Sequence, residues 1–223
     1  MFIQLDNHLI NKVLSYRGKH PIVSQCIPTT EKCVMEVMEA RSSRRKPVIL
    51  KWLILSGWKT PKDYICSKAA ACNNLEILKW ARGVGCPWDT ETCASAASNG
   101  HLDILKWARE NGCPWNERTC ACAAALGHLE ILKWLRENGC PWDAETCTLS
   151  ASTDQLHILK WARSNGCPWD TNTCSNAAKS GNLEMLKWAI ENGCLWNVNI
   201  IGLANRNHHF HIVEWMRQNN YIS

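Results

Sequence analysis

Apolar positions in residues 86–112 recur with the spacing of a short amphipathic helix. Cys93, Ala96 and Ala97 stand at i, i+3 and i+4, so they share one helical face. Asp89 precedes them as an expected N-cap, because its carboxylate can accept hydrogen bonds from the unpaired N–H groups of the first turn. An Asn-Gly pair follows and predicts the end of this first helix.

A second apolar stripe begins directly after that break. Leu102, Leu105 and Ala108 share one face, and charged residues occupy the opposite face. Asn111-Gly112 ends the stripe, since glycine readily adopts the left-handed conformation of a helix C-cap. The two stripes together predict a helix–turn–helix unit whose apolar faces must be covered by neighbouring copies.

The unit returns every 27 residues, and tryptophan marks the period most clearly. The chain has 223 residues and 13 Trp, against only 2 Phe and 3 Tyr. Two series follow the period: Trp80, Trp107, Trp134, Trp161, Trp188 and Trp215, and then Trp88, Trp115, Trp142, Trp169 and Trp196. Every copy must pack against the next one, and a large residue that is present in every copy suits that role, so we interpret both series as packing residues. The repetition predicts an all-α fold, an α-solenoid of stacked helix–turn–helix repeats.

The period also divides the chain. Five repeats are expected within residues 59–193, namely 59–85, 86–112, 113–139, 140–166 and 167–193. We interpret residues 29–58 as a degenerate N-terminal capping repeat and residues 194–223 as a C-terminal capping repeat. Terminal repeats need a polar outer face to keep the ends of a stack soluble, so both ends are expected to depart from the common pattern.

Ten of the 14 cysteines follow the same period. One column is Cys66, Cys93, Cys120, Cys147 and Cys174, and the other is Cys86, Cys113, Cys140, Cys167 and Cys194. Equivalent cysteines of adjacent copies should lie about one helix diameter apart, roughly 10 Å. Disulfide-bonded residues usually have Cα atoms within about 7 Å, so neither column is expected to form bridges along itself. We interpret both columns as small buried apolar residues.

The residues Cys86, Cys93 and His101 have the chemistry of zinc ligands. Their spacing differs from the compact Cys-x2-Cys pattern of zinc motifs, and the His101 position becomes Gln in a later copy. The histidines of the His208–His211 segment are interpreted as a polar surface of the terminal repeat. We therefore expect no bound metal and no cofactor.

The net charge of +5 permits anionic partners without requiring them. Lys106 and Arg109, with equivalents in other copies, line up on the second helix and suggest a phosphate-binding stripe. Asp103 and Glu110 lie three and four residues from Lys106, so the charges can pair locally. We also expect no aromatic residue between these cations that could stack against bases. A nucleic-acid partner is therefore not predicted.

The second-helix sequence has a recognisable family pattern. Residues 127–139, Gly-His-Leu-Glu-Ile-Leu-Lys-Trp-Leu-Arg-Glu-Asn-Gly, resemble the second helix of an ankyrin repeat, and Ala123-Ala124 resembles the Ala-Ala of its first helix. The match recurs from about residue 59 to 219 and is most similar to the short Cys-Pro-Trp-Asp type found in giant viruses and in some algae and protists. The unit of 27 residues is shorter than the usual one of about 33 and lacks the Thr-Pro-Leu-His signature. The resemblance thus implies ankyrin-like helix pairs with shortened connecting loops, without the projecting β-hairpin of that family.

Positions that change between copies are the candidates for recognition. They lie on the first helix, opposite its apolar stripe, and in the family that the chain resembles this helix lines a concave groove. The candidate protein-binding residues are Tyr64, Lys68, Glu91, Ser95, Arg118, Cys122, Glu145, Leu149, Asn172, Asn176 and Lys179. The same face is expected to include Ala94 and Ala121. Recognition and unconstrained drift both produce such variation, and both interpretations stay open.

No catalytic constellation recurs in the chain. It has no nucleophile elbow, no phosphate-binding Gly-rich loop and no His-Glu-x-x-His motif. We therefore predict a non-enzymatic, monomeric scaffold that binds a protein partner, a host protein if the chain is viral. The chain contains no apolar run of about 18 residues, so no membrane span is predicted. The N-terminus lacks the pattern of a signal peptide. A cytoplasmic location is expected, in the host cell for a viral protein, with the nucleus as the alternative; we interpret the basic Arg41–Lys46 segment as an exposed turn rather than an import signal.

Residues 1–28 permit two interpretations. Leu5, Leu9 and Val13 lie on one face of an expected amphipathic helix. This N-terminal helical segment is either a hydrophobic lid on the first repeat or the first helix of a curtailed F-box, because Leu5-x3-Leu9-Ile-x2-Val13 is similar to the opening of that motif. The F-box resemblance implies the alternative function, a substrate-recognition adaptor that partners ubiquitin-ligase subunits.

Overall fold

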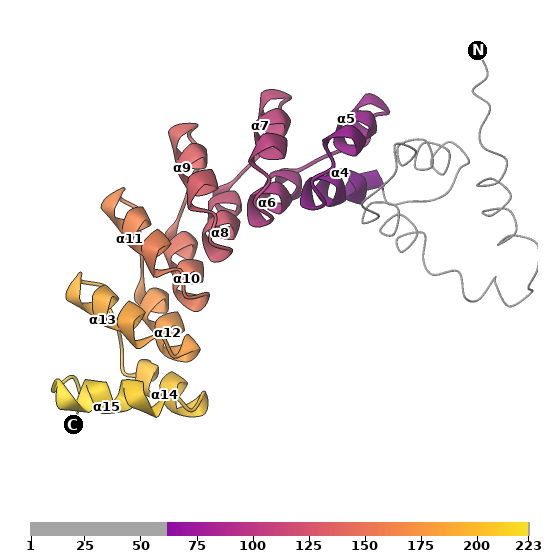
Figure 1. The fold of residues 1–223 in the computed structure, drawn as a ribbon. Coiled ribbons are helices and arrows are strands. Elements are labelled where there is room, and N and C mark those ends of the chain that lie inside the picture. The colour runs from indigo at the N-terminus through magenta and orange to yellow at the C-terminus, as the bar shows by residue number, and fades with distance from the viewer. Residues whose placement is uncertain (1–61, 223) are drawn as a thin grey trace, which may run out of the picture. The chain divides into compact units, whose positions relative to one another are not determined.

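The computed structural model describes residues 62–222, which are helical apart from their turns. The helices, labelled in Figure 1, are α4 (Lys62–Ala71), α5 (Leu75–Gly83), α6 (Thr90–Ser98), α7 (Leu102–Glu110), α8 (Glu117–Ala125), α9 (Leu129–Glu137), α10 (Ala144–Ser152), α11 (Leu156–Ser164), α12 (Thr171–Ser180), α13 (Leu183–Glu191), α14 (Asn199–Arg206) and α15 (Phe210–Gln218). The all-α prediction is confirmed for this part of the chain. The predicted segments 1–28 and 29–58, with the basic Arg41–Lys46 segment, lie outside the described residues.

The helices alternate between two layers. α4, α6, α8, α10, α12 and α14 are the first helices of their repeats, and they pack against one another in sequence. The second helices, α5, α7, α9, α11, α13 and α15, pack mainly on the first helix of their own repeat. Figure 1 shows these pairs in a curved row with the first helices on its inner side. The arrangement is the predicted α-solenoid.

Side-chain size explains the curvature of this row. Cys93, Ala96 and Ala97 of α6, a helix that packs against two other first helices, are fully buried. Small side chains let two helix axes approach closely. The second helices carry larger residues such as Leu105 and Trp107, and neighbouring second helices contact one another far less. Closer spacing on one side bends the row, so the side of the first helices is concave.

The helix ends form as the sequence predicts. The Asp89 carboxylate accepts a hydrogen bond from the Glu91 N–H at 3.0 Å, and Asp143 and Asp170 cap their helices in the same way. Gly112 has a φ of 84°, the left-handed conformation expected after the second helix. The N-cap and C-cap predictions are therefore confirmed.

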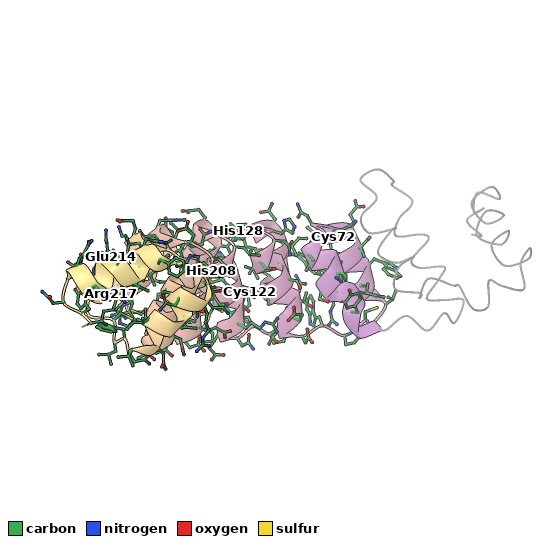
Figure 2. All side chains as sticks on the ribbon, turned by 90° about the horizontal axis from the view of Figure 1, so that it is seen from below. Cys72, Cys122, His128, His208, Glu214 and Arg217 are labelled. Carbon is green, nitrogen blue, oxygen red and sulfur yellow. The ribbon has the colours of Figure 1, made fainter. Side chains whose placement is uncertain are left out.

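Histidines connect three of the repeats to the one before, a role that the sequence did not reveal. His101 Nε2 lies 3.0 Å from the Ala71 carbonyl oxygen, and His128 Nε2 lies 3.0 Å from the Ser98 carbonyl oxygen. The His128 ring, whose position Figure 2 marks, covers Gly100, where an added Cβ would lie 2.9 Å from the ring. The His128 ring of the following repeat therefore leaves room only for a small residue at this turn. The φ of 78° at Gly100 independently favours glycine there.

Half-buried tryptophans join the repeats on the side of the second helices. Trp88 and Trp107 of one repeat meet edge to face, with ring centroids 5.9 Å apart. Arg82 of the preceding repeat lies 4.1 Å above the Trp88 ring and donates a hydrogen bond to the Cys86 carbonyl oxygen at 2.6 Å. The same stacking recurs in the pairs Arg109–Trp115, Arg136–Trp142 and Arg163–Trp169. At about 0.5–1 kcal/mol for each exposed cation–π contact, these residues stabilise the interfaces between copies, so the predicted packing role is confirmed.

The last helix pair ends the row with a mixed surface. Tyr221 packs against both Trp196 and Trp215, at centroid distances of 5.7 and 5.3 Å, and covers the end of the tryptophan series. Leu195 and Phe210, however, are 75% and 61% exposed. The exposed surface of this repeat is therefore less polar than the sequence predicts for a capping repeat.

Candidate protein-binding surface

Each first helix that has another first helix on both sides leaves one narrow stripe of residues open to solvent. On α6 this stripe is Glu91, Ser95 and Ser98, spaced i, i+4 and i+7. Ala94 is only 2% exposed, and its equivalent Ala121 is fully buried. The expectation that these two alanines lie on the surface is therefore wrong. The reason is that two other first helices flank each inner first helix and a second helix covers its back, so most of its circumference is buried.

The eleven candidate residues all reach solvent, and we call them the concave surface. Its exposed members are Arg118, Glu145, Asn172 and Lys179. Its half-buried members are Tyr64, Lys68, Glu91, Ser95, Cys122, Leu149 and Asn176. They belong to five successive first helices, α4 to α12, and Figure 2 shows Cys122 near the middle of the row. The structure thus brings the candidate residues together on one side of the solenoid.

Arg118 is the centre of a charged cluster on this surface. Its guanidinium lies 3.3 Å from the Glu91 carboxylate and so joins α8 to α6. A hydrogen bond with the Cys122 side chain, followed by the carboxylates of Glu91 and Glu145, raises the pKa of Arg118. The side chains of Arg118 and Glu91 are 63% and 46% exposed, so solvent screens their ion pair, which contributes about 0–1 kcal/mol to folding. The central cluster of Glu91, Arg118, Cys122 and Glu145 is therefore available to a partner.

Charge is unevenly distributed along the concave surface. At its N-terminal end the Lys68 ammonium lies 4.8 Å from the centroid of the Tyr64 ring. The central cluster carries two carboxylates around one guanidinium. At the C-terminal end, α12 and α14 contain no Asp or Glu, and Lys179 is exposed. The surface therefore changes from acidic at its centre to basic at its C-terminal end.

Three further residues extend this surface onto α14, and the sequence analysis missed them. Asn199 and Arg206 are exposed, and Leu203 is half-buried. They stand one period of 27 residues after the candidate residues of α12. The period alone would have found them, but the divergent sequence of the last copy hid the register.

The cations on the side of the second helices have partners of two kinds. Lys133 and Lys187 pair with the glutamates three residues before them, at 2.7 and 3.1 Å, so local ion pairing is confirmed at these positions. Lys79 and Lys160 lie 5.7 and 5.9 Å from the centroids of tryptophan rings in the next repeat. The expectation that no aromatic residue lies between these cations is therefore wrong, because the stacking brings the rings of the following copy beside them. The absence of a nucleic-acid partner stays a prediction.

The residues considered as metal ligands have other roles in the structure. His101 bonds a backbone carbonyl, and both cysteine columns are buried, as predicted for small apolar residues. His209 and His211 likewise lie 3.1 and 3.0 Å from carbonyl oxygens of the preceding repeat. Among residues 62–222 no group of three or more His, Cys, Asp or Glu side chains is arranged to hold a metal ion.

No protein-family model matches the chain, and no curated protein matches it significantly. The helices of the described part are also too short to cross a membrane. A family assignment therefore depends on the resemblance of the repeats themselves.

Proposed function

We propose that residues 62–222 are a protein-binding module of the ankyrin type, which holds a segment of another protein along the concave surface. The observation that carries the proposal is a contrast between packing positions and surface positions. The positions of Cys93 and Ala97 keep their residue type in all five repeats between residues 59 and 193. The Glu91 position instead reads Tyr64, Glu91, Arg118, Glu145, Asn172 and Asn199 along the chain.

Rigidity makes such a surface effective in binding. Its side chains project from helices that are capped at Asp89 and equivalent residues and connected through the histidine and tryptophan contacts. Immobilising a flexible side chain on binding costs about 0.5–1.5 kcal/mol, and a preorganised scaffold lowers the total ordering cost. In a solenoid that is held in one geometry, ordering of side chains and backbone on binding therefore offsets less of the free energy gained from contacts.

The composition of the concave surface supports a protein partner. It combines the charged central cluster with the half-buried Leu149 and the Tyr64 ring, a mixture of polar and apolar groups typical of interfaces that form and dissociate. The resemblance to ankyrin repeats supports the same face, because in that family the first helices line the binding groove. The adaptor alternative depends on residues 1–28, which lie outside the described part, and no contact among residues 62–222 favours it.

Affinity capture with the full chain tests the proposal. We expect replacement of Glu91, Arg118, Glu145 and Asn172 by Ala to reduce recovery of the specific partner at least tenfold, because a few residues at the centre of an interface carry most of its binding energy. The matched control replaces Glu110, Glu137, His157 and Arg217, which are exposed on second helices and have the same total charge. Quantitative mass spectrometry of the captured proteins is the measurement.

A stability control accompanies the capture. Because the Arg118–Glu91 pair is exposed, Arg118→Ala should change the free energy of unfolding by no more than about 1 kcal/mol in urea. Partner loss in the concave variant can then be assigned to the surface rather than to unfolding. Equal loss in the concave and control variants would contradict the choice of face.

A further inference from the structure

The cysteines of the two columns meet in pairs across the interfaces between repeats. The Cys113 thiol donates a hydrogen bond at 3.4 Å to the carbonyl oxygen of Asp89, which caps the helix that carries Cys93. The Cys93 and Cys113 thiols, 20 residues apart in the sequence, also interact with each other. The same contact occurs in the pairs Cys120–Cys140, Cys147–Cys167 and Cys174–Cys194. In the first pair the Cys66 thiol donates to the carbonyl oxygen of Cys86 at 3.9 Å. Each pair joins a first helix to the turn that begins the next repeat.

The pairing is more specific than packing of small residues requires. Some neighbouring buried positions tolerate change: Ser150 replaces the alanine of the Ala96 position, and Leu135 replaces that of the Ala108 position. Both members of the cysteine pair are nevertheless Cys at five successive interfaces. In the last repeat both are lost together, to Ile201 and Tyr221. The chain therefore keeps these cysteines as pairs.

The surroundings of each pair favour a neutral product over a charged one. Every member of the five pairs is at most 3% exposed. Burial raises the pKa of the Cys66 thiol to about 12. The hydrogen bond to the partner thiol together with burial raises the pKa of Cys113, and the same hydrogen bond lowers the pKa of Cys93, so the pair retains a proton. A thiolate or a charged metal–thiolate complex would be costly in this apolar interior. A disulfide carries no charge and needs no solvent.

We propose that the five cysteine pairs are latent disulfide sites that lock neighbouring repeats together under oxidising conditions. The oxidant is a low-molecular-weight disulfide such as oxidised glutathione. One cysteine displaces one glutathione and forms a mixed disulfide, and the second cysteine displaces the other glutathione and closes the protein disulfide. Two protein thiols are oxidised, one glutathione disulfide is reduced, and both thiol protons end on the released glutathione.

Geometry and access decide how this reaction proceeds. The two thiols of a pair already interact with each other, whereas cysteines within one column are separated by a whole repeat. Because the pairs are buried, oxidation waits for neighbouring repeats to separate, and repeats at the ends of a solenoid open most readily. Once closed, each bond prevents its interface from reopening. The concave surface of the oxidised chain is thereby held in one shape.

The test oxidises the full chain in glutathione buffers of increasing oxidising strength. Cys26, Cys33, Cys72 and Cys122, which are outside the pairs, are replaced by Ser, and circular dichroism confirms native helicity before oxidation. Remaining thiols are alkylated under denaturing conditions, and disulfide-linked peptides are mapped by mass spectrometry. We expect thiols to disappear in twos, with Cys93 linked to Cys113 and the other pairs linked accordingly. The urea midpoint should rise with oxidation and return on reduction, because each bond closes a loop of the unfolded chain.

A matched variant makes the result specific. Cys113→Ala should leave Cys93 reduced or as a glutathione adduct, while the other four pairs still close. The proposal is overturned if the ten thiols stay reduced in folded protein, or if links form within a column, such as Cys93 to Cys120. If the four-serine variant lacks native helicity, the same peptide mapping on the wild-type chain gives the decision. This inference is independent of the proposed protein-binding function.

Discussion

Raising the pH from 8.5 to 10.5 under reducing conditions is expected to unfold the solenoid. One thiol in each of the five cysteine pairs has a raised pKa: Cys66, Cys113, Cys120, Cys147 and Cys174. In the unfolded chain these thiols ionise near their ordinary pKa of about 8.5. The folded chain keeps them protonated, so the stability they contribute is complete below that pH and is lost as the pH rises toward the folded values, about 12 for Cys66.

The size of this effect follows from linkage. Each such thiol costs about 1.4 kcal/mol per pH unit once the unfolded chain has lost its proton. The hydrogen bond that raises the pKa of Cys113 lowers that of Cys93, and the Cys174–Cys194 pair behaves in the same way, so these two pairs contribute little net slope. Cys66, Cys120 and Cys147 together cost about 4 kcal/mol per unit. A domain of this size has a total stability of about 5–15 kcal/mol. Circular dichroism at increasing pH, with urea titrations at each pH, gives the slope of the unfolding free energy.

A variant without two of the pairs is the control for other alkaline titrations. Replacing Cys120, Cys140, Cys147 and Cys167 by Ala should reduce the slope by about two thirds, because two of the three raised thiols without a lowered partner are gone. The variant keeps every lysine and tyrosine of the wild-type chain, so the two proteins differ only in their cysteines. An identical slope in both proteins would show that the buried thiols are not the cause.

The second large effect is expected for Gly181→Ala. Gly181 has a φ of 80°, and an added Cβ would lie 2.6 Å from the ring of His209. The ring would have to move and would lose its contact of 3.1 Å with the Lys179 carbonyl oxygen. We expect a loss of about 3 kcal/mol in the free energy of unfolding, from the left-handed backbone, the steric contact and the lost hydrogen bond together. Urea unfolding followed by tryptophan fluorescence measures it.

Gly166→Ala separates the backbone contribution from the contact. Gly166 has nearly the same φ of 82°, but an added Cβ there would meet nothing within 4 Å. Its substitution should cost only the backbone strain of about 1–2 kcal/mol. Equal losses for the two variants would mean that His209 does not hold the last repeat against the turn at Gly181.

Much of the fold could be predicted because its signals are local. Asp89 caps the helix that begins at the next residue, and Gly112 ends the helix that precedes it, so a short window of sequence contains the cause of each boundary. Because the same caps and apolar stripes recur every 27 residues, each copy supports the assignment made in the others. The same logic selected the exposed stripe of the first helix, since i, i+4 and i+7 share one helical face.

The parts that could not be predicted depend on contacts between non-equivalent positions. Comparison at the 27-residue period relates Cys93 to Cys120, but in the structure Cys93 meets Cys113, which opens the next repeat. The burial of Ala94 has a similar cause, because a first helix has neighbours on both sides and a single repeat shows neither. The joining of Arg118 to Glu91 also requires the stacking distance between repeats, which the sequence does not contain.

Site-specific photo-crosslinking is the most direct measurement of the central claim, that the concave surface holds a protein partner. A benzophenone amino acid is placed at Ser95 or Asn176, both on the concave surface, and at Glu110 or His157 on second helices. After irradiation in the native cell, we predict that both concave positions crosslink to the same protein and that the second-helix positions do not. Crosslinks to a partner from Glu110 or His157, with none from Ser95 or Asn176, would contradict the account.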